Sequence, residues 1–202
     1  MCTEPAKSHG AADALDWDEA LSLIDRLYDD GHIRESMLVA SGCYLGLRIS
    51  DILTLRWKDV FCGEKEFDKI EKKTGKKRLL RFNGTYVEHA RKCYLSSGED
   101  NEDRYIFTGQ KTLGDRHITR QCAAQILEKI KEDYKVKTAK TFSAHSLRKT
   151  FGRRVWMQEC KKGRGETALM LLCDVFNHSS VEITKRYLGI RKDEILSVYD
   201  AL

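Results

Sequence analysis

Five side chains of this 202-residue chain could act together on a phosphate diester. Arg48 and Arg148 carry planar guanidinium groups, each of which can donate to two phosphate oxygens at once. His145 and His178 could donate hydrogen bonds or move protons, since an imidazole titrates close to neutral pH. The hydroxyl of Tyr187 could attack phosphorus and form a covalent bond. Together these residue types predict phosphoryl transfer by a tyrosine nucleophile.

The local spacing supports part of this set and leaves simpler alternatives open. His145 and Arg148 are three residues apart on a predicted helix, so their side chains share a face while Leu147 points to the core. A His-x-x-Arg pair by itself is also typical of a solvated helix face, and Arg48 by itself could be a surface arginine. Tyr187 could pack in the core, because a phenol with a pKa of about 10 is a poor nucleophile unless positive charges favour the phenolate.

The composition fits a packed core with a basic surface region. Apolar residues make up 41% of the chain and charged residues 33%, and 36 Lys and Arg against 31 Asp and Glu give a net charge of +5. Residues 137–164 hold nine basic residues and the single acid Glu159. A local basic block is a better indication of phosphate contact than the total charge.

The sequence also predicts several absences. Seven widely spaced cysteines without a Cys-x-x-Cys pair favour reduced thiols over a disulfide framework or a zinc site. No stretch approaches the roughly 18 apolar residues of a membrane span. The chain offers neither a carboxylate cluster for a metal nor a Gly-rich nucleotide loop. We therefore expect a cytoplasmic protein that has no membrane segment. We also expect that the protein needs no metal and no cofactor.

Apolar periodicity predicts that most of the chain is helical. Asp16 should cap the first helix, Gly46 should end the second, and Ser50 should cap a short third helix. The predicted helices cover residues 17–27, 33–45, 51–56, 84–95, 119–131, 143–160, 166–176, 181–188 and 191–201.

Three short segments have the spacing typical of strands. They are residues 58–60, 66–72 and 77–82, and Thr74-Gly75 supplies the turn between the last two. We therefore expect a mainly α fold with a small three-stranded antiparallel β-sheet, of the α+β class. Residues 1–15 are predicted to be a linker or a disordered N-terminus, and residues 16–202 a single domain.

Four segments in order resemble the catalytic domain of tyrosine recombinases, the phage-integrase family. The family pattern is an arginine in a Gly-Leu-Arg segment, a lysine in a hairpin, His-x-x-Arg, a His or Trp, and a tyrosine about nine residues later. The resemblance extends over nearly all of residues 16–202 and implies the fold of that catalytic domain. The matching segments read GLRISDILTLRW, KKTGKKRLL, HSLRKTFGRR and NHSSVEITKRY.

This resemblance implies a role for each member of the set. Arg48 and Arg148 would clamp the scissile DNA phosphate. His145 and His178 would donate hydrogen bonds to it and assist proton transfer. Tyr187 would attack phosphorus, leaving a 3′-phosphotyrosyl bond and a free 5′-hydroxyl.

In the family, the hairpin lysine protonates the leaving 5′ oxygen. Alignment of Lys-Thr-Gly at the turn favours Lys73 for this role, and Lys72, Lys76 and Lys77 remain alternatives. The residues predicted to contact DNA are Lys76, Lys77, Lys149 and Arg153.

The resemblance also implies partners. These are double-stranded DNA recombination sites, other recombinase protomers in a tetrameric synapse, and possible accessory DNA-bending proteins. Members usually carry an N-terminal DNA-binding domain that this chain is expected to lack, so its own DNA affinity should be weak and salt-dependent. The expected source is a bacterium or phage, and the expected location is the nucleoid.

Two positions depart from the family pattern without removing a predicted catalytic group. Asn177 stands where members commonly have glycine, and Lys149 follows Arg148 where many carry histidine. Two other functions stay open. One is a type IB topoisomerase-like DNA-relaxing enzyme, and the other is a degenerate module that only binds DNA.

Overall fold

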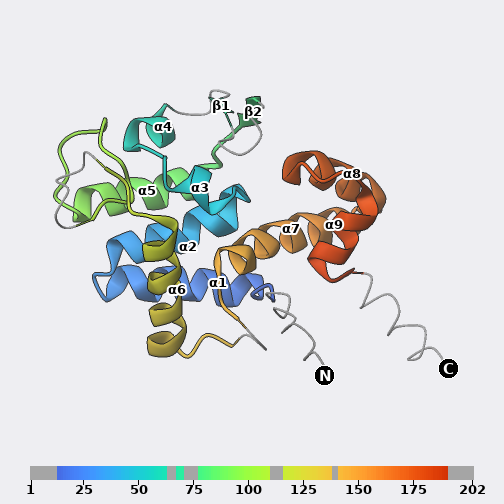
Figure 1. Ribbon diagram of the computed structural model, residues 1–202, viewed down its shortest axis with the longest axis horizontal. Helices are drawn as coiled ribbons and strands as arrows, with labels where there is room; N and C mark the ends of the chain where they lie inside the picture. The colour runs from blue at the N-terminus through green and yellow to red at the C-terminus, as the bar shows by residue number, and fades with distance from the viewer. Residues whose placement is uncertain (1–12, 63–66, 71–76, 110–115, 138–140, 191–202) are drawn as a thin grey trace, which may run out of the picture.

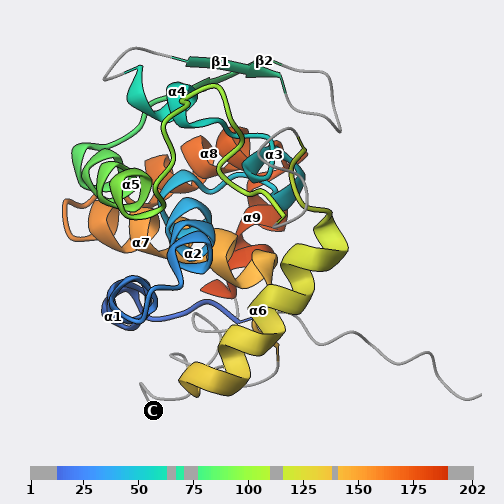
Figure 2. The same cartoon turned by 90° about the vertical axis from the view of Figure 1, so that its left-hand side faces the viewer.

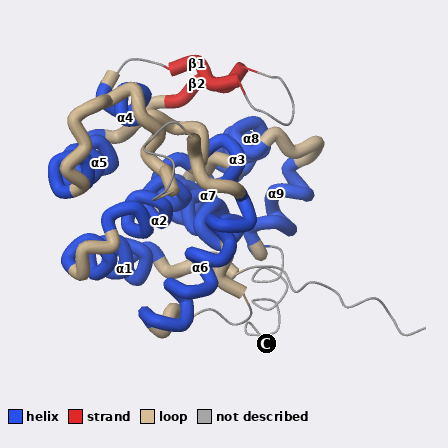
Figure 3. The backbone as a smooth tube through the Cα atoms, turned by 60° about the vertical axis from the view of Figure 1, so that its left-hand side comes forward, coloured by secondary structure: helices blue, strands red, loops and turns tan. Residues whose placement is uncertain are grey.

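The computed structural model describes residues 13–62, 67–70, 77–109, 116–137 and 141–190. Within these ranges the chain forms nine helices and one antiparallel pair of strands (Figures 1 and 3). The elements are α1 (Trp17–Asp29), α2 (Ile33–Leu45), α3 (Ile49–Ile52), α4 (Trp57–Phe61), β1 (Phe67–Ile70), β2 (Lys77–Leu80), α5 (Gly84–Ser96), α6 (Arg120–Tyr134), α7 (Ala144–Cys160), α8 (Gly165–Phe176) and α9 (Val181–Leu188).

Buried apolar side chains form two clusters, and α7 connects them. The larger cluster is built mainly from α1, α2, α5 and α6, and α7 contributes Leu147 from its first turn. The smaller cluster joins Phe176 of α8 and Leu188 of α9 to Phe151 of α7. Figure 1 shows α7 running from the main group of helices to α8 and α9. The part of α7 between Leu147 and Phe151 therefore lies where the two clusters meet.

The contact between α2 and α7 depends on Gly42. A Cβ atom at this position would lie 2.5 Å from the Cβ atom of Leu147, which is 1% exposed. This close approach places the C-terminal end of α2 beside α7, so that Arg148 reaches the carbonyl oxygen of Gly46. Packing in the core thus brings together two segments about a hundred residues apart.

Local capping explains several of the helix ends. Asp16 caps α1 and accepts a hydrogen bond from the backbone N–H of Asp18, as predicted. Gly46 follows α2 in the left-handed conformation, with φ 55°. Thr119 caps α6 by accepting from the N–H of Cys122. The helices predicted at 17–27, 33–45, 84–95, 119–131, 143–160, 166–176 and 181–188 are confirmed to within a few residues at their ends.

The predicted three-stranded sheet is confirmed only in part. β1 and β2 pair in an antiparallel hairpin register, near α4 at the edge of the molecule (Figures 1 and 2). Residues 58–60 were expected to form a strand, and this is wrong because they belong to α4. Trp57 and Val60 are both buried one helical turn apart, and Asp59 accepts a hydrogen bond from the N–H of Arg56 at the helix start. No third strand joins the hairpin in the part of the chain that the structure describes.

The short third helix begins earlier than predicted. Arg48, and not Ser50, is the N-cap residue of α3, because the carbonyl of Arg48 already accepts from the N–H groups of Asp51 and Ile52. The Thr74-Gly75 turn and the helix expected at 191–201 lie outside the described residues.

Packing of the domain includes the end of the segment assigned to the N-terminal linker. Leu15 is buried, and its N–H donates to Oγ1 of Thr150 at 2.8 Å. The six described cysteines are free thiols, of which Cys43, Cys93 and Cys173 are buried. No helix among the described residues has the length and apolar character needed to cross a membrane.

The Gly42 contact leads to a stability prediction. Replacing a helical glycine with alanine ordinarily stabilises a helix by about 1 kcal/mol. For Gly42→Ala we expect the opposite sign, a loss of about 1–3 kcal/mol in the free energy of unfolding, because the new methyl overlaps Leu147. Chemical denaturation would measure the change.

Gly84→Ala is the matched control. Gly84 also lies in a helix, and no atom stands within 4 Å of where its Cβ would be. This variant should be neutral or slightly stabilising. Equal effects at the two positions would contradict the packing argument.

Candidate active site

The two arginines singled out from the sequence meet at one backbone oxygen. Nη2 of Arg48 donates to the carbonyl oxygen of Phe176 at 3.3 Å, and Nη2 of Arg148 donates to the same oxygen at 3.0 Å. Arg148 also donates through Nη1 to the carbonyl of Gly46 at 2.8 Å. The structure therefore brings Arg48 and Arg148 together.

Burial of Arg148 is compensated by the ends of two helices. Its side chain is only 5% exposed, and its guanidinium stacks on the ring of Phe176 at 4.5 Å from the centroid. Phe176 is the last residue of α8, and Gly46 directly follows α2. Carbonyls at helix C-termini carry partial negative charge, so they stabilise a buried cation.

Two like charges this close repel each other. The shared carbonyl limits the two guanidinium nitrogens to about 6 Å of separation, a distance at which the repulsion is substantial. An anion with several oxygens, placed between the two groups, would relieve this repulsion and take up donors that now point at backbone. The arrangement is thus suited to bind a phosphate.

His178 is held by α9 and lies beside both arginines. Its Nδ1 atom is 3.0 Å from Oγ1 of Thr184, a residue with no exposed surface. Partial burial first, and then the charges of Arg148 and Arg48, hold the pKa of His178 below its ordinary value of 6.5. The ring is therefore neutral at pH 7.

His145 stands at the N-terminal end of α7, where its side chain is exposed. Burial of part of the ring, together with the charges of Arg148 and Lys149, lowers the pKa of His145. Its ring centroid is 6.3 Å from that of Tyr187. Both predicted histidines therefore lie near the predicted nucleophile, in neutral form at pH 7.

Tyr187 projects from α9 and packs against the rings of His178 and Phe176. Its centroid lies 5.3 Å from the ring of His178 and 5.5 Å from that of Phe176, both edge-to-face. The hydroxyl donates a long hydrogen bond of 3.4 Å to the carbonyl of His145. Burial raises the pKa of Tyr187 to about 12, although the charge and hydrogen bond of Arg148 and the charge of Arg48 act in the opposite direction. The phenol is thus neutral at pH 7, and it would have to lose its proton to act as a nucleophile.

The remaining predicted site residues are spread more widely. Lys73 and Lys76 lie outside the described residues, and Lys77 is the first residue of β2. Lys149 is buried against Tyr187, with Nζ 5.3 Å from the ring centroid. Nη1 of Arg153 donates to the carbonyl of Leu188, at the end of α9, at 3.5 Å.

Three groups that contact the predicted site residues were not predicted from the sequence. Two of them are the backbone carbonyls of Phe176 and Gly46. Every residue has a backbone carbonyl, so the amino-acid types at these positions could not predict the contacts. Thr184 could have been noticed only through its place on the α9 face three residues before Tyr187. No cluster of three or more His, Cys, Asp or Glu side chains in the described ranges could hold a metal ion.

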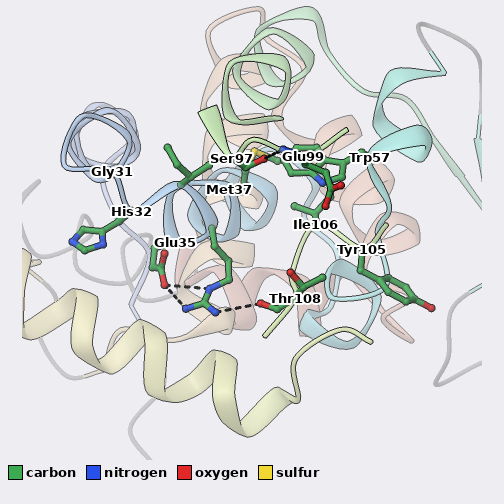
Figure 4. Close-up of a pocket in the computed structure, with 12 residues that line it drawn as sticks. Gly31, His32, Glu35, Met37, Trp57, Ser97, Glu99, Tyr105, Ile106 and Thr108 are labelled. Atoms are coloured by element: carbon green, nitrogen blue, oxygen red, sulfur yellow. Dashed lines mark hydrogen bonds and ion pairs between the residues drawn. The ribbon is translucent and has the colours of Figure 1, made fainter. Parts of the chain in front are cut away.

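The structure contains one cavity that borders this region and another that lies apart from it. One of about 360 Å³ opens beside His145 and is also lined by Ile49 and Arg120. Another of about 460 Å³ lies at the N-terminal end of α2 (Figure 4). Two of its charged residues pair with each other, because Arg34 bonds to Glu35 at 2.6 Å, and Arg34 also bonds to a backbone carbonyl. Among the described residues, none of the predicted catalytic side chains lines this second cavity.

Comparison with solved structures identifies the fold. A crystal structure of XerA recombinase matches 98% of this chain and 66% of its own, with a TM-score of 0.67 and 20% identity. The post-cleavage complex of XerH site-specific recombinase, bound to a palindromic difH substrate, matches 98% of this chain and 56% of its own, with a TM-score of 0.65 and 17% identity. The described residues thus have the catalytic-domain fold of tyrosine recombinases. The chain spans about two thirds or less of these relatives.

Comparison of the sequence with protein families agrees with this fold. The phage integrase family matches residues 14–194, and the chain belongs to this family. It is 32% identical over 166 residues to the probable integrase/recombinase YoeC of Bacillus subtilis (strain 168), which covers 82% of this chain and 83% of that protein.

The electrostatics of the site can be tested without DNA. Because Arg48 lowers the pKa of His178 and is no contributor for His145, Arg48→Gln should raise the pKa of His178 towards 6.5. The pKa of His145 should stay unchanged and serves as an internal control. Titration of the imidazole resonances by NMR would measure both values. A shift of His145 with His178 unmoved would contradict the described geometry.

Proposed function

We propose that this chain is the catalytic domain of a site-specific DNA recombinase that cuts and rejoins strands through Tyr187. The observation that carries the proposal is that Arg48 and Arg148 both donate to the carbonyl oxygen of Phe176, whose ring packs against Tyr187. Family membership supports the same reaction class.

In this mechanism the scissile phosphate replaces the Phe176 carbonyl as acceptor for the two arginines. The hydroxyl of Tyr187 attacks phosphorus, and its proton passes to a neutral imidazole. The P–O5′ bond breaks, and a 3′-phosphotyrosyl bond forms. Preorganised donors aimed at the developing negative charge are worth roughly 10²–10³ in rate each.

The leaving 5′ oxygen needs a proton, and Lys73 is the proposed donor. The hairpin described by β1 and β2 supports this role, since the residues between the strands include Lys72, Lys73 and Lys76. Attack of the 5′-hydroxyl of a second strand on the phosphotyrosine reverses these steps. Because the covalent bond conserves the energy of the diester, the proposal requires no nucleotide. It requires no metal cofactor, because the two arginines and two histidines supply the donors that stabilise the transition state.

The proposed partners are duplex recombination sites and further protomers on the DNA. XerH was crystallised with its DNA substrate after cleavage, and its fold matches 98% of this chain. The basic residues of 137–164 favour contact with phosphates, and Lys76, Lys77 and Arg153 are proposed contributors. A tetrameric synapse and accessory DNA-bending proteins complete the assembly that we propose, in a bacterial or phage setting.

The central test is covalent capture on DNA. Nicked suicide duplexes carrying candidate sites should trap a denaturant-resistant adduct with the wild-type chain. Tyr187→Phe should reduce adduct formation by about 10³-fold or more while leaving DNA affinity unchanged, because it removes only the attacking oxygen. Electrophoresis after denaturation would measure the adduct, and filter binding the affinity.

A second tyrosine provides the control. Tyr94 packs against Trp57 and Phe61, away from the site, so Tyr94→Phe should keep the adduct. An adduct that survives in Tyr187→Phe would show that another residue is the nucleophile. Relaxation of supercoiled DNA without site preference would favour the topoisomerase-like alternative, and binding without any adduct would favour the degenerate DNA-binding module.

A further inference from the structure

Lys149 occupies an unusual place for a lysine. It follows Arg148 on α7, and its side chain is 8% exposed. Its Nζ atom lies 5.3 Å from the centroid of the Tyr187 ring. Burial of an ammonium group is unfavourable unless nearby groups compensate for the lost hydration. The neighbours of Lys149 should therefore explain what it does.

The compensation comes from one acid and from the Tyr187 ring. The carboxylate of Asp13 favours the charged form of Lys149, whereas burial and the charge of Arg153 lower its pKa. Asp13 is fixed nearby because the N–H of Leu15 is bonded to Thr150, the residue after Lys149. The other charged or titratable groups on this side are His145 and Arg148 on α7 and His178 beside Tyr187.

We propose that Lys149 is a positioning residue for the nucleophile. Its ammonium attracts the electron-rich ring of Tyr187 and fixes its orientation, and it stabilises the negative charge that spreads into this ring as the phenol loses its proton. The carboxylate of Asp13 supports this role, because it favours the charged form of Lys149. The inference rests on the proposed function, in which Tyr187 is the nucleophile.

The geometry separates this role from phosphate binding. A lysine that contacts DNA phosphates ordinarily has an exposed ammonium, and each such contact adds to the salt dependence of binding. Lys149 is buried against an aromatic ring instead. A change at Lys149 should therefore affect the rate of cleavage and leave DNA affinity and its salt dependence as they are.

The test compares Lys149→Met, Lys149→Arg and the control Lys92→Met in the full chain. Lys92 is exposed on α5 and pairs with Glu88, so the control removes one positive charge elsewhere. Single-turnover adduct formation on suicide duplexes is followed against pH, and DNA affinity against salt. At neutral pH, Lys149→Met should lower the cleavage rate about 10- to 100-fold, while Lys149→Arg and Lys92→Met stay within about threefold of wild type.

The pH profile adds a second signature. The pKa of Lys149 is lowered from 10.5, so wild type loses this positive charge as the pH rises towards that value. The advantage of wild type over Lys149→Met should shrink over the same range, whereas Lys149→Arg keeps its charge and its rate. Equal rates in wild type and Lys149→Met at neutral pH would overturn the proposal. Weaker DNA binding with a smaller salt slope in Lys149→Met would also overturn it, in favour of a phosphate contact.

A measurement without DNA keeps this inference distinguishable from the proposed function. The free energy of unfolding is compared for Lys149→Met, Tyr187→Leu and the double variant. A contact between ammonium and ring predicts that the two losses are not additive, with the double variant more stable than their sum implies. Additive losses would overturn the contact, whereas failure of the wild type to form an adduct would overturn the proposed function alone.

Discussion

The carbonyl oxygen of Phe176 accepts hydrogen bonds from both Arg48 and Arg148, and the rest of the site depends on this contact. It requires that the end of α2, the first turns of α7 and the end of α8 meet at one point. Helix C-termini direct partial negative charge at the two cations and so help to keep them together there. In the proposed mechanism, a DNA phosphate takes the place of this carbonyl as the acceptor for both arginines.

The pKa of Tyr187, the proposed nucleophile, is subject to opposing influences. The rings of Phe176 and His178 bury Tyr187 and raise its pKa, while Arg148 and Arg48 favour its phenolate. Because the effect of burial is the larger one, the phenol stays protonated at neutral pH and does not form the phenolate. Neutral imidazoles nearby provide acceptors for its proton. Partial burial is the main cause that lowers the pKa of both imidazoles, and the charge of Arg148 adds to it in each case.

The helical architecture could be predicted because its signals are local. Spacing of apolar residues and the caps Asp16 and Thr119 depend on a few neighbouring positions. Prediction failed where burial decided between local alternatives. Residues 58–60 have no strong local preference, and burial of Trp57 and Val60 on one side selects a helix. The contact of Lys149 with the ring of Tyr187 could not be predicted either, because it depends on how α7 and α9 pack together.

The sequence by itself determined the residue types, their order and the shared helix face of His145 and Arg148. These suffice for the family, because a tyrosine nucleophile and its phosphate-binding partners must be encoded as side chains. The tertiary structure decided which of them meet, through contacts such as Arg48 with Phe176, 128 residues apart. The decisive acceptor is a backbone carbonyl, which every residue carries. It becomes specific only when helix ends are brought together by close packing at Gly42 and Leu147.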